Sequence, residues 1–136
     1  MKNGGFLKRY VGLRRAGNRY GAKPVHNLMT GQTFDSQGEY GRWGELRLLE
    51  RAGHLSSLTQ HPKIILVPGV SGLPEIAWHP DYSYVEDGRV VYEDYKPRKV
   101  TDRENLLFKL WRHFGPGPLR ITSHGGKLLK QIAGKP

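Results

Sequence analysis

The spacing of hydrophobic side chains predicts a helix over residues 36–52. Glu39 lies four residues before Trp43, and Leu46 follows three residues after it, so the three side chains share one helical face. A face that carries tryptophan and leucine packs toward the protein interior. Glu39 is therefore predicted to be an inward-facing carboxylate that needs a partner, although its spacing from Ser36 also suits a capping box.

Three strands are predicted after this helix. The wholly apolar run 63–67 lies between two prolines, which is typical of a buried strand. Two further stretches, 77–85 and 89–96, flank the pair Asp87-Gly88. Asp-Gly between two such stretches is the strongest short-range signal for a β-hairpin, so we expect these two strands to pair with each other.

A second helix is predicted over residues 101–114. Thr101 occupies the cap position, and Glu104 follows at the spacing of a capping box. The apolar side chains that share the inner face of this helix are Leu107, Leu110, Trp111 and Phe114. Glycines and prolines at 115–118 end the helix, and the run 119–122 predicts a last strand.

The length of 136 residues predicts one compact domain with a core of its own. We expect this domain to span residues 25–123. Residues 1–24 are basic, rich in glycine and without periodicity, which predicts an extended N-terminal arm. Residues 124–136 predict a basic C-terminal tail that frays.

The charge of the chain indicates the class of its partner. Lys and Arg number 22 against 12 Asp and Glu, which gives a formal net charge of +10. Such an excess is the electrostatic footprint of a protein that binds a phosphate backbone, so DNA is the predicted partner. The side chains predicted to contact DNA are Arg14, Arg15, Arg19, Lys23, Lys99, Arg103 and Lys109. A solvated leader and a solvated helix face are the alternatives for these residues.

Several kinds of site and location are excluded by what the sequence lacks. It has no cysteine, which excludes disulfides and a thiolate zinc site, and its six histidines show no ligand-like spacing. It has no apolar stretch of signal-peptide or membrane-span length. We therefore expect a cytoplasmic protein without a membrane partner.

The predicted hairpin brings two acidic side chains together. With a two-residue turn at its centre, paired positions have numbers that sum to 175, so Asp81 faces Asp94. Paired residues share a sheet face, with Cβ atoms about 4.5–5.5 Å apart. Lys96 points the same way as Asp94 and lies opposite His79.

Two facing carboxylates repel each other and need a compensating cation or a shared proton. Mg²⁺ or Mn²⁺ suits such a pair, because both ions take hard oxygen ligands. Lys96 would then stabilise negative charge on an attacked phosphate. The alternative is a surface hairpin in which Lys96 pairs with Asp94 across solvent.

The order of these acidic and basic residues resembles the PD-(D/E)XK nuclease superfamily. The pieces are Glu39, Pro80-Asp81 and Asp94-Tyr95-Lys96. The stretches "RYGAKP", "FDSQGEYGRWGELRLLERAG", "LTQHPKIILVPG" and "VEDGRVVYEDYKP" are similar to a phage-encoded family of unknown function in that superfamily. This resemblance implies an α/β fold with a restriction-endonuclease-like core, in which a mixed sheet is flanked by helices in the order αβββαβ.

The resemblance also implies roles for individual residues. Asp81, Asp94 and Glu39 would bind the metal, and Lys96 would be the catalytic lysine. Glu93 points to the opposite face of the sheet by strand alternation, so we do not expect it to bind the metal.

The implied activity is that of a metal-dependent DNA endonuclease. The layout is similar to that of archaeal and phage Holliday-junction resolvases, which implies branched DNA as the substrate, a role in phage recombination or DNA processing, and a location in the host cytoplasm. Cutting both strands with one site per chain predicts a homodimer, through either the ridge of Gly38, Gly41 and Gly44 or the second helix. The alternatives are a non-catalytic nucleic-acid-binding module with a nuclease-like fold and a nicking or duplex endonuclease.

Overall fold

The structure is a computed structural model that describes residues 25–26, 33–34 and 37–136. The chain divides into two compact units, Met1–Trp43 and Gly44–Pro136, a boundary that the sequence does not predict. The predicted arm 1–24 lies outside the described residues.

The first unit contains a short strand pair and the start of a helix. Strand β1 (Val25–His26) pairs antiparallel with β2 (Thr33–Phe34). The first predicted helix is confirmed as α2 (Gln37–Arg51), which continues into the second unit. Glu39 and Leu46 are both buried, as their shared helical face predicts.

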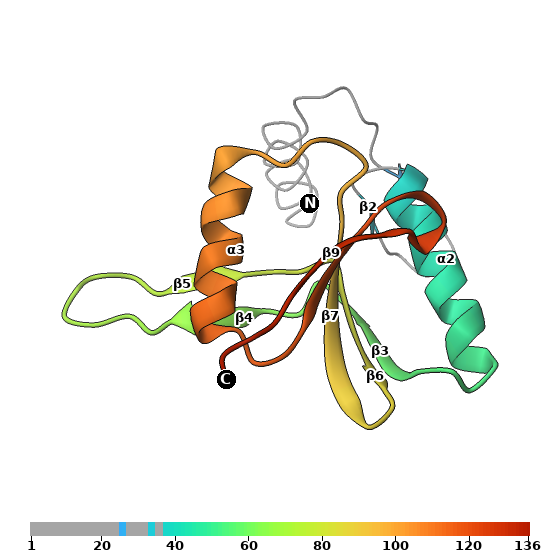
Figure 1. Cartoon of the computed structure of the whole chain (residues 1–136), viewed down its shortest axis with the longest axis horizontal. Coiled ribbons are helices and arrows are strands. Elements are labelled where there is room, and N and C mark those ends of the chain that lie inside the picture. The colour runs from blue at the N-terminus through green and yellow to red at the C-terminus, as the bar shows by residue number, and fades with distance from the viewer. Residues whose placement is uncertain (1–24, 27–32, 35–36) are drawn as a thin grey trace, which may run out of the picture. The chain divides into compact units, whose positions relative to one another are not determined.

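The second unit is built on a mixed five-stranded sheet, which confirms the predicted α/β class (Figure 1). Strands β7 and β8 are parallel, and the other neighbours are antiparallel. The spatial order is β3 (Ser56–Gln60), β6 (Tyr82–Glu86), β7 (Arg89–Tyr95), β8 (Leu119–Thr122) and β9 (Leu128–Ile132). The parallel pair requires a crossover, which α3 (Asp102–Phe114) supplies.

Two strands of this sheet are absent from the sequence-based prediction. Leu58 is the one apolar residue of strand β3, and its side chain is only partly buried. The backbone N–H of Leu58 donates to Glu50 Oε2 across 3.1 Å. Strand β9 pairs with β8 in antiparallel register, so the prediction of a fraying tail over 124–136 is wrong. Ile132 is buried opposite Leu119, and this contact holds the C-terminal strand on the sheet.

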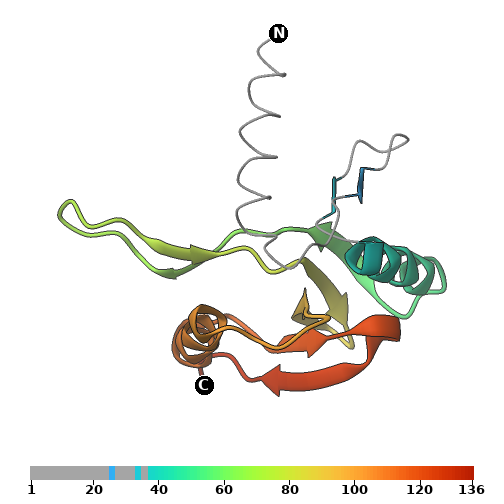
Figure 2. The same cartoon turned by 90° about the horizontal axis from the view of Figure 1, so that it is seen from above.

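Helix α3 lies beside β4 and β9 in the second unit (Figure 2). Phe108 and Trp111 are buried there with Tyr92. The predicted face is wrong for Phe114, whose side chain is 46% exposed. The indole of Trp111 donates to the carbonyl of Gly117 across 2.8 Å, and this bond fixes which side of the helix faces the sheet.

A separate two-stranded sheet, called the ribbon below, consists of β4 (Ile64–Val67) and β5 (Ile76–Trp78) with the connection between them. The predicted buried strand 63–67 is a strand, but of its residues only Leu66 is buried. The prediction of a single strand over 77–85 is wrong, because β5 ends at Trp78 and β6 begins at Tyr82. Pro80 has no backbone N–H to donate to a neighbouring strand, which explains the break between β5 and β6.

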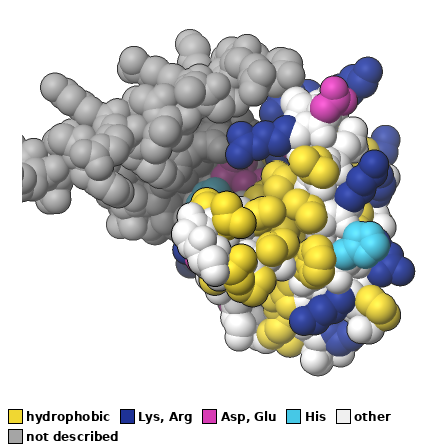
Figure 3. All heavy atoms as spheres, turned by 90° about the vertical axis from the view of Figure 1, so that its left-hand side faces the viewer, with side chains coloured by type: hydrophobic (Ala, Val, Ile, Leu, Met, Phe, Trp, Pro, Cys, Tyr) yellow, Lys and Arg dark blue, Asp and Glu magenta, His cyan; other side chains and the backbone are white. Residues whose placement is uncertain are grey.

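Hydrophobic side chains are exposed on both the ribbon and α3 (Figure 3). They include Ile65, Val70, Leu73 and Ile76 of the ribbon and Leu106 and Phe114 of α3. Among the described residues, no helix is both long and apolar enough to cross a membrane.

Candidate active site at the open end of the hairpin

The β6–β7 hairpin has the predicted register. Tyr82 pairs with Glu93, and every pair down to the turn keeps the same sum of position numbers. Both turn residues have positive φ, 51° at Asp87 and 77° at Gly88, which is the conformation that a tight two-residue hairpin turn requires. The register places Asp81, which directly precedes β6, beside the end of β7 that carries Asp94.

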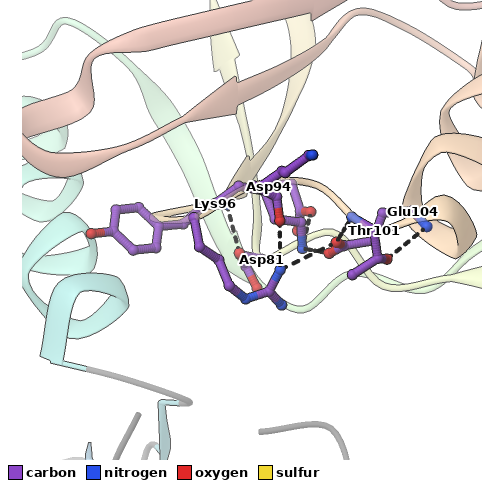
Figure 4. A network of polar contacts seen from close by, with 8 residues as sticks. Asp81, Asp94, Lys96, Thr101 and Glu104 are labelled. Atoms are coloured by element: carbon purple, nitrogen blue, oxygen red, sulfur yellow. Dashed lines mark hydrogen bonds and ion pairs between the residues drawn. The ribbon is translucent and has the colours of Figure 1, made fainter. Parts of the chain in front are cut away.

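Asp81 and Asp94 are held by the end of β7 in different ways (Figure 4). The backbone N–H of Tyr95 donates to Asp81 Oδ2 across 2.7 Å, which directs this carboxylate toward the neighbouring strand. Asp94 is itself in β7, and its side chain is only 3% exposed. A charge buried to this extent needs a partner of opposite sign.

Lys96 supplies that partner and reaches a second carboxylate as well. Its Nζ lies 2.8 Å from Asp94 Oδ2 and 2.7 Å from Glu104 Oε2, and its side chain is 16% exposed. Burial by itself would lower the pKa of Lys96, but the charges of Asp94 and Asp81 outweigh burial and raise this pKa above its ordinary value. Lys96 is therefore positively charged at neutral pH.

Two details of the sequence-based picture of Lys96 are wrong. It is not opposite His79, because the strand that would hold His79 in register is interrupted at Pro80, and His79 is exposed. The ion pair with Asp94 is also not across solvent, since both side chains are largely buried. The surface-hairpin alternative therefore does not describe this site.

Glu104 is the site residue that the sequence pattern missed. The predicted capping box is present, with Thr101 N–H donating to Glu104 Oε1 across 2.9 Å and Glu104 N–H donating to Thr101 Oγ1 across 3.2 Å. The second carboxylate oxygen of Glu104 pairs with Lys96. Burial would raise the pKa of Glu104, but its bonds with Lys96 and Thr101 lower it to about 2. The same carboxylate thus caps α3 and fixes the lysine.

We expect Glu104→Gln to lower the free energy of unfolding at pH 7 by about 1–3 kcal/mol, the range for hydrogen bonds to charged groups. Glutamine can keep the capping bond to Thr101, so the loss reports the ion pairs of Glu104 with Lys96 at 2.7 Å and with Arg98 at 3.4 Å. Because the pKa of folded Glu104 is lowered from 4.5 to about 2, its stabilisation is present above pH 4.5 and is lost as the pH falls toward 2. Urea unfolding of wild type and variant at several pH values measures this.

The matched control is Asp102→Asn, which removes an exposed acid from the same helical turn. It should cost less than Glu104→Gln at pH 7. A difference between wild type and Glu104→Gln that stays constant from pH 7 to pH 2 would contradict the ion pair.

His61 also reaches the site from the end of β3. Its backbone N–H donates to the carbonyl of Asp81 across 2.9 Å, which continues the β3–β6 pairing by one residue. A ring nitrogen of His61 and a carboxylate oxygen of Asp81 lie within 4.8 Å of each other. The spacing of the histidines along the sequence does not indicate this position of His61, because strand β3 was not predicted.

The other residues considered from the sequence are Glu39, Glu93 and the basic side chains. Glu39 is buried on α2 and belongs to the first unit. Glu93 accepts hydrogen bonds from the hydroxyls of Tyr84 (2.8 Å) and Thr122 (3.0 Å). The exposed side chains predicted to contact DNA are Lys99, Arg103 and Lys109. The other side chains predicted to contact DNA lie outside the described residues, and they are Arg14, Arg15, Arg19 and Lys23.

A family model described as "Protein of unknown function (DUF1064)" matches residues 17–114. The chain belongs to this family. The match to the family includes Asp81, Asp94, Lys96 and Glu104, whereas strands β8 and β9 lie beyond it. No curated protein and no solved structure matches the chain.

Proposed function

We propose that the protein is a metal-dependent DNA endonuclease. The observation that carries this proposal is the buried Asp94 paired with a charged Lys96, next to a second carboxylate, Asp81, at the open end of one hairpin. Burying such groups together is costly for stability, and perturbed ionisable clusters of this kind concentrate at functional sites. The net charge of +10 supports a phosphate-backbone substrate.

The order of elements supports a restriction-endonuclease-like core. When the ribbon is treated as an insertion between β3 and β6, the chain runs α2, β3, β6, β7, α3, β8. With β3 in the place of the predicted strand 63–67, this order of elements supports the order αβββαβ that the resemblance implies. Strand β9 is then an addition at the edge of the sheet.

The donor groups fit a divalent cation. Asp81 and Asp94 offer carboxylate oxygens, and an ionised carboxylate can accept at both of its oxygens. These are hard oxygen donors, and such a donor set suits Mg²⁺ or Mn²⁺. A bound ion of this kind would lower the pKa of a water molecule so that it attacks the phosphate.

The side chains of the site have separate tasks in the proposed reaction. Asp81 and Asp94 hold and orient the cation, and Lys96 stabilises the negative charge that develops on the attacked phosphate. Glu104 keeps Lys96 extended toward the site through the 2.7 Å contact. We propose Glu39 as a further ligand or base on the strength of the sequence pattern. Lys99, Arg103 and Lys109, with the basic residues of the arm, are proposed to contact the DNA backbone.

The proposed substrate is branched DNA, such as a Holliday junction in phage recombination, cut in the host cytoplasm. A junction requires two cuts, and the described residues bring together one such site, so we propose a homodimer. Helix α3 exposes Leu106 and Phe114 and stays one candidate interface. Gly41 and Gly44 of the other candidate, the glycine ridge, have no atom within 4 Å of an added Cβ, so an approaching chain would find room there.

One observation favours a second function, a non-catalytic nucleic-acid-binding module. The ammonium of Lys96 already pairs with both Asp94 and Glu104, so the cluster is stable as an ion-pair network without a metal cation. Such a protein would bind DNA in a salt-dependent manner and release no product.

Incubation with labelled four-way junction, nicked, flap and linear duplex DNA distinguishes these functions. We expect cleavage of the four-way junction in Mg²⁺ or Mn²⁺, no cleavage in EDTA, and slower cleavage of linear duplex. Preferred cutting of nicked or linear DNA would favour a nicking or duplex endonuclease. Salt-dependent binding with no product in any metal would overturn the proposal.

A further inference from the structure

We propose that His61 is a nitrogen ligand of the metal site and that it makes this site select Mn²⁺ over Mg²⁺. This inference rests on the proposed metal-dependent function and names the ion that the site takes. Three features of the described residues carry it: the row of side chains across the sheet, the backbone conformation of His61, and the charges of the neighbouring groups.

His61 and Asp81 lie one residue beyond the neighbouring ends of β3 and β6, and Asp94 lies in the next strand, β7. In β3 and β6, Gln60 pairs with Tyr82, and the next position outward is His61 beside Asp81, joined by the 2.9 Å backbone hydrogen bond. In β6 and β7 the last paired residues are Tyr82 and Glu93, and the next residues outward are Asp94 and Asp81, whose Oδ2 accepts from the Tyr95 N–H. Three adjacent strands therefore present, near the same end, a row of side chains that can each ligate a metal.

The side chain of His61 is turned toward this row. Its ring nitrogen lies within 4.8 Å of a carboxylate oxygen of Asp81, a separation that one ion bound between the two atoms would bridge. Two ligand bonds of about 2.0–2.2 Å reach across at most about 4.4 Å, so binding one ion draws the two atoms together from any larger separation.

The backbone of His61 is in the left-handed region, with φ of 51°, where non-glycine residues are uncommon. Pro62 follows directly and removes the next N–H from the ladder, so the chain turns away from β3 at this point. The surrounding hydrogen bond must hold this conformation, and strained positions of this kind gather at ligand sites. The strain therefore supports a role for His61 in binding.

The charges of the site favour a neutral third ligand. Asp81, Asp94 and Glu104 supply three carboxylates, and the single ammonium of Lys96 lies 2.8 Å from Asp94 and 2.7 Å from Glu104. An imidazole adds a donor without adding charge. Mg²⁺ strongly prefers oxygen ligands, whereas imidazole suits transition metals, so a nitrogen donor shifts the preference toward Mn²⁺.

Pulsed electron paramagnetic resonance of the purified protein with bound Mn²⁺ tests this inference without any DNA. Electron spin-echo envelope modulation detects a ¹⁴N nucleus bound to Mn²⁺. We expect ¹⁴N modulation in the wild type and its loss in His61→Asn. Asparagine tolerates a positive φ, so this variant should keep the fold, which circular dichroism checks. His79→Ala removes an exposed histidine near the same strand end and is the matched control, which should keep the modulation.

Metal competition gives a second readout. We expect Mg²⁺ to displace Mn²⁺ from the wild type only at Mg²⁺ concentrations at least about tenfold higher than those of Mn²⁺. His61→Asp supplies an oxygen ligand instead of nitrogen, so this variant should need a smaller excess of Mg²⁺ to displace Mn²⁺. Wild-type protein that binds no Mn²⁺ or shows no ¹⁴N modulation would overturn the inference, as would unchanged modulation in His61→Asn.

The outcomes separate this inference from the proposed function. Metal-dependent DNA cleavage without ¹⁴N modulation would overturn the role of His61 and leave the endonuclease proposal standing. A ¹⁴N signal that depends on His61, in a protein that cleaves none of the four DNA substrates, would support the ligand and overturn the endonuclease.

Discussion

Asp94→Asn should lower the rate of metal-dependent DNA cleavage by about 10³-fold. In the proposed site Asp94 is a metal ligand, and a bound metal contributes several kcal/mol to the stabilisation of the transition state, where each 1.4 kcal/mol is about tenfold in rate. DNA affinity should be unchanged or higher, because the variant removes one negative charge that faces the phosphate backbone. Single-turnover cleavage and salt-matched binding measurements separate the two effects.

The fold should survive Asp94→Asn. Asparagine has nearly the same shape as aspartate, and Lys96 keeps its 2.7 Å contact with Glu104. Asp87→Asn is the matched control, since it makes the same chemical change in the exposed turn at the far end of the hairpin, where asparagine accepts the positive φ. Cleavage by Asp94→Asn at the wild-type rate would contradict the assignment of the active site.

Lys96→Met should reduce both cleavage and stability. Removing a group that stabilises transition-state charge costs about 10²–10³-fold in rate. Removing one partner of a buried ion pair costs about 3–5 kcal/mol of stability, because Asp94 keeps its charge in a site where its side chain is 3% exposed. Cleavage assays and urea unfolding at pH 7 measure the two losses.

The pH dependence of the stability loss follows from the raised pKa of Lys96. The stabilisation is fully present below the ordinary pKa of 10.5 and is lost as the pH rises through the higher folded value. The difference in free energy of unfolding between wild type and Lys96→Met should therefore be constant from pH 6 to pH 10 and shrink above that.

Two further variants make the Lys96 prediction specific. Lys127→Met removes an exposed lysine and should change neither rate nor stability appreciably. The double variant Lys96→Met with Asp94→Asn should be more stable than Lys96→Met alone, because Asp94 no longer leaves a buried charge without its lysine partner. A double variant that is less stable than either single variant would contradict the ion pair.

The parts of this site that could be predicted from sequence are those fixed by local chemistry. Asp87-Gly88 specifies a two-residue turn, and the turn fixes the register that brings Asp81 beside Asp94. Thr101 and Glu104 specify the start of α3 in the same local way. In each case a few neighbouring residues decide the geometry.

The parts that could not be predicted depend on contacts between distant segments. Strand β3 has no hydrophobic pattern of its own and forms because it pairs with β6. The position of His61, at the end of β3, therefore could not be predicted from the sequence. The pairing of Glu104 with Lys96 depends on the path of the chain between them, which no propensity encodes. The basic C-terminal residues predict a tail, whereas strand β9 forms by pairing with β8 and buries only Ile132 of its five residues.

The ribbon leaves the sheet at Pro62 and returns at Pro80, and the hydrogen bond between His61 and Asp81 closes it at its base. Because this hydrogen bond joins the two ends of the ribbon, the number of residues in the ribbon does not alter the pairing of β3 with β6. The exposed tip around residues 68–75 is therefore a place where sequence can be lengthened, exchanged or fused to another domain without rebuilding the scaffold. A fluorophore or an affinity handle grafted there would leave unchanged the strands that hold Asp81 and Asp94.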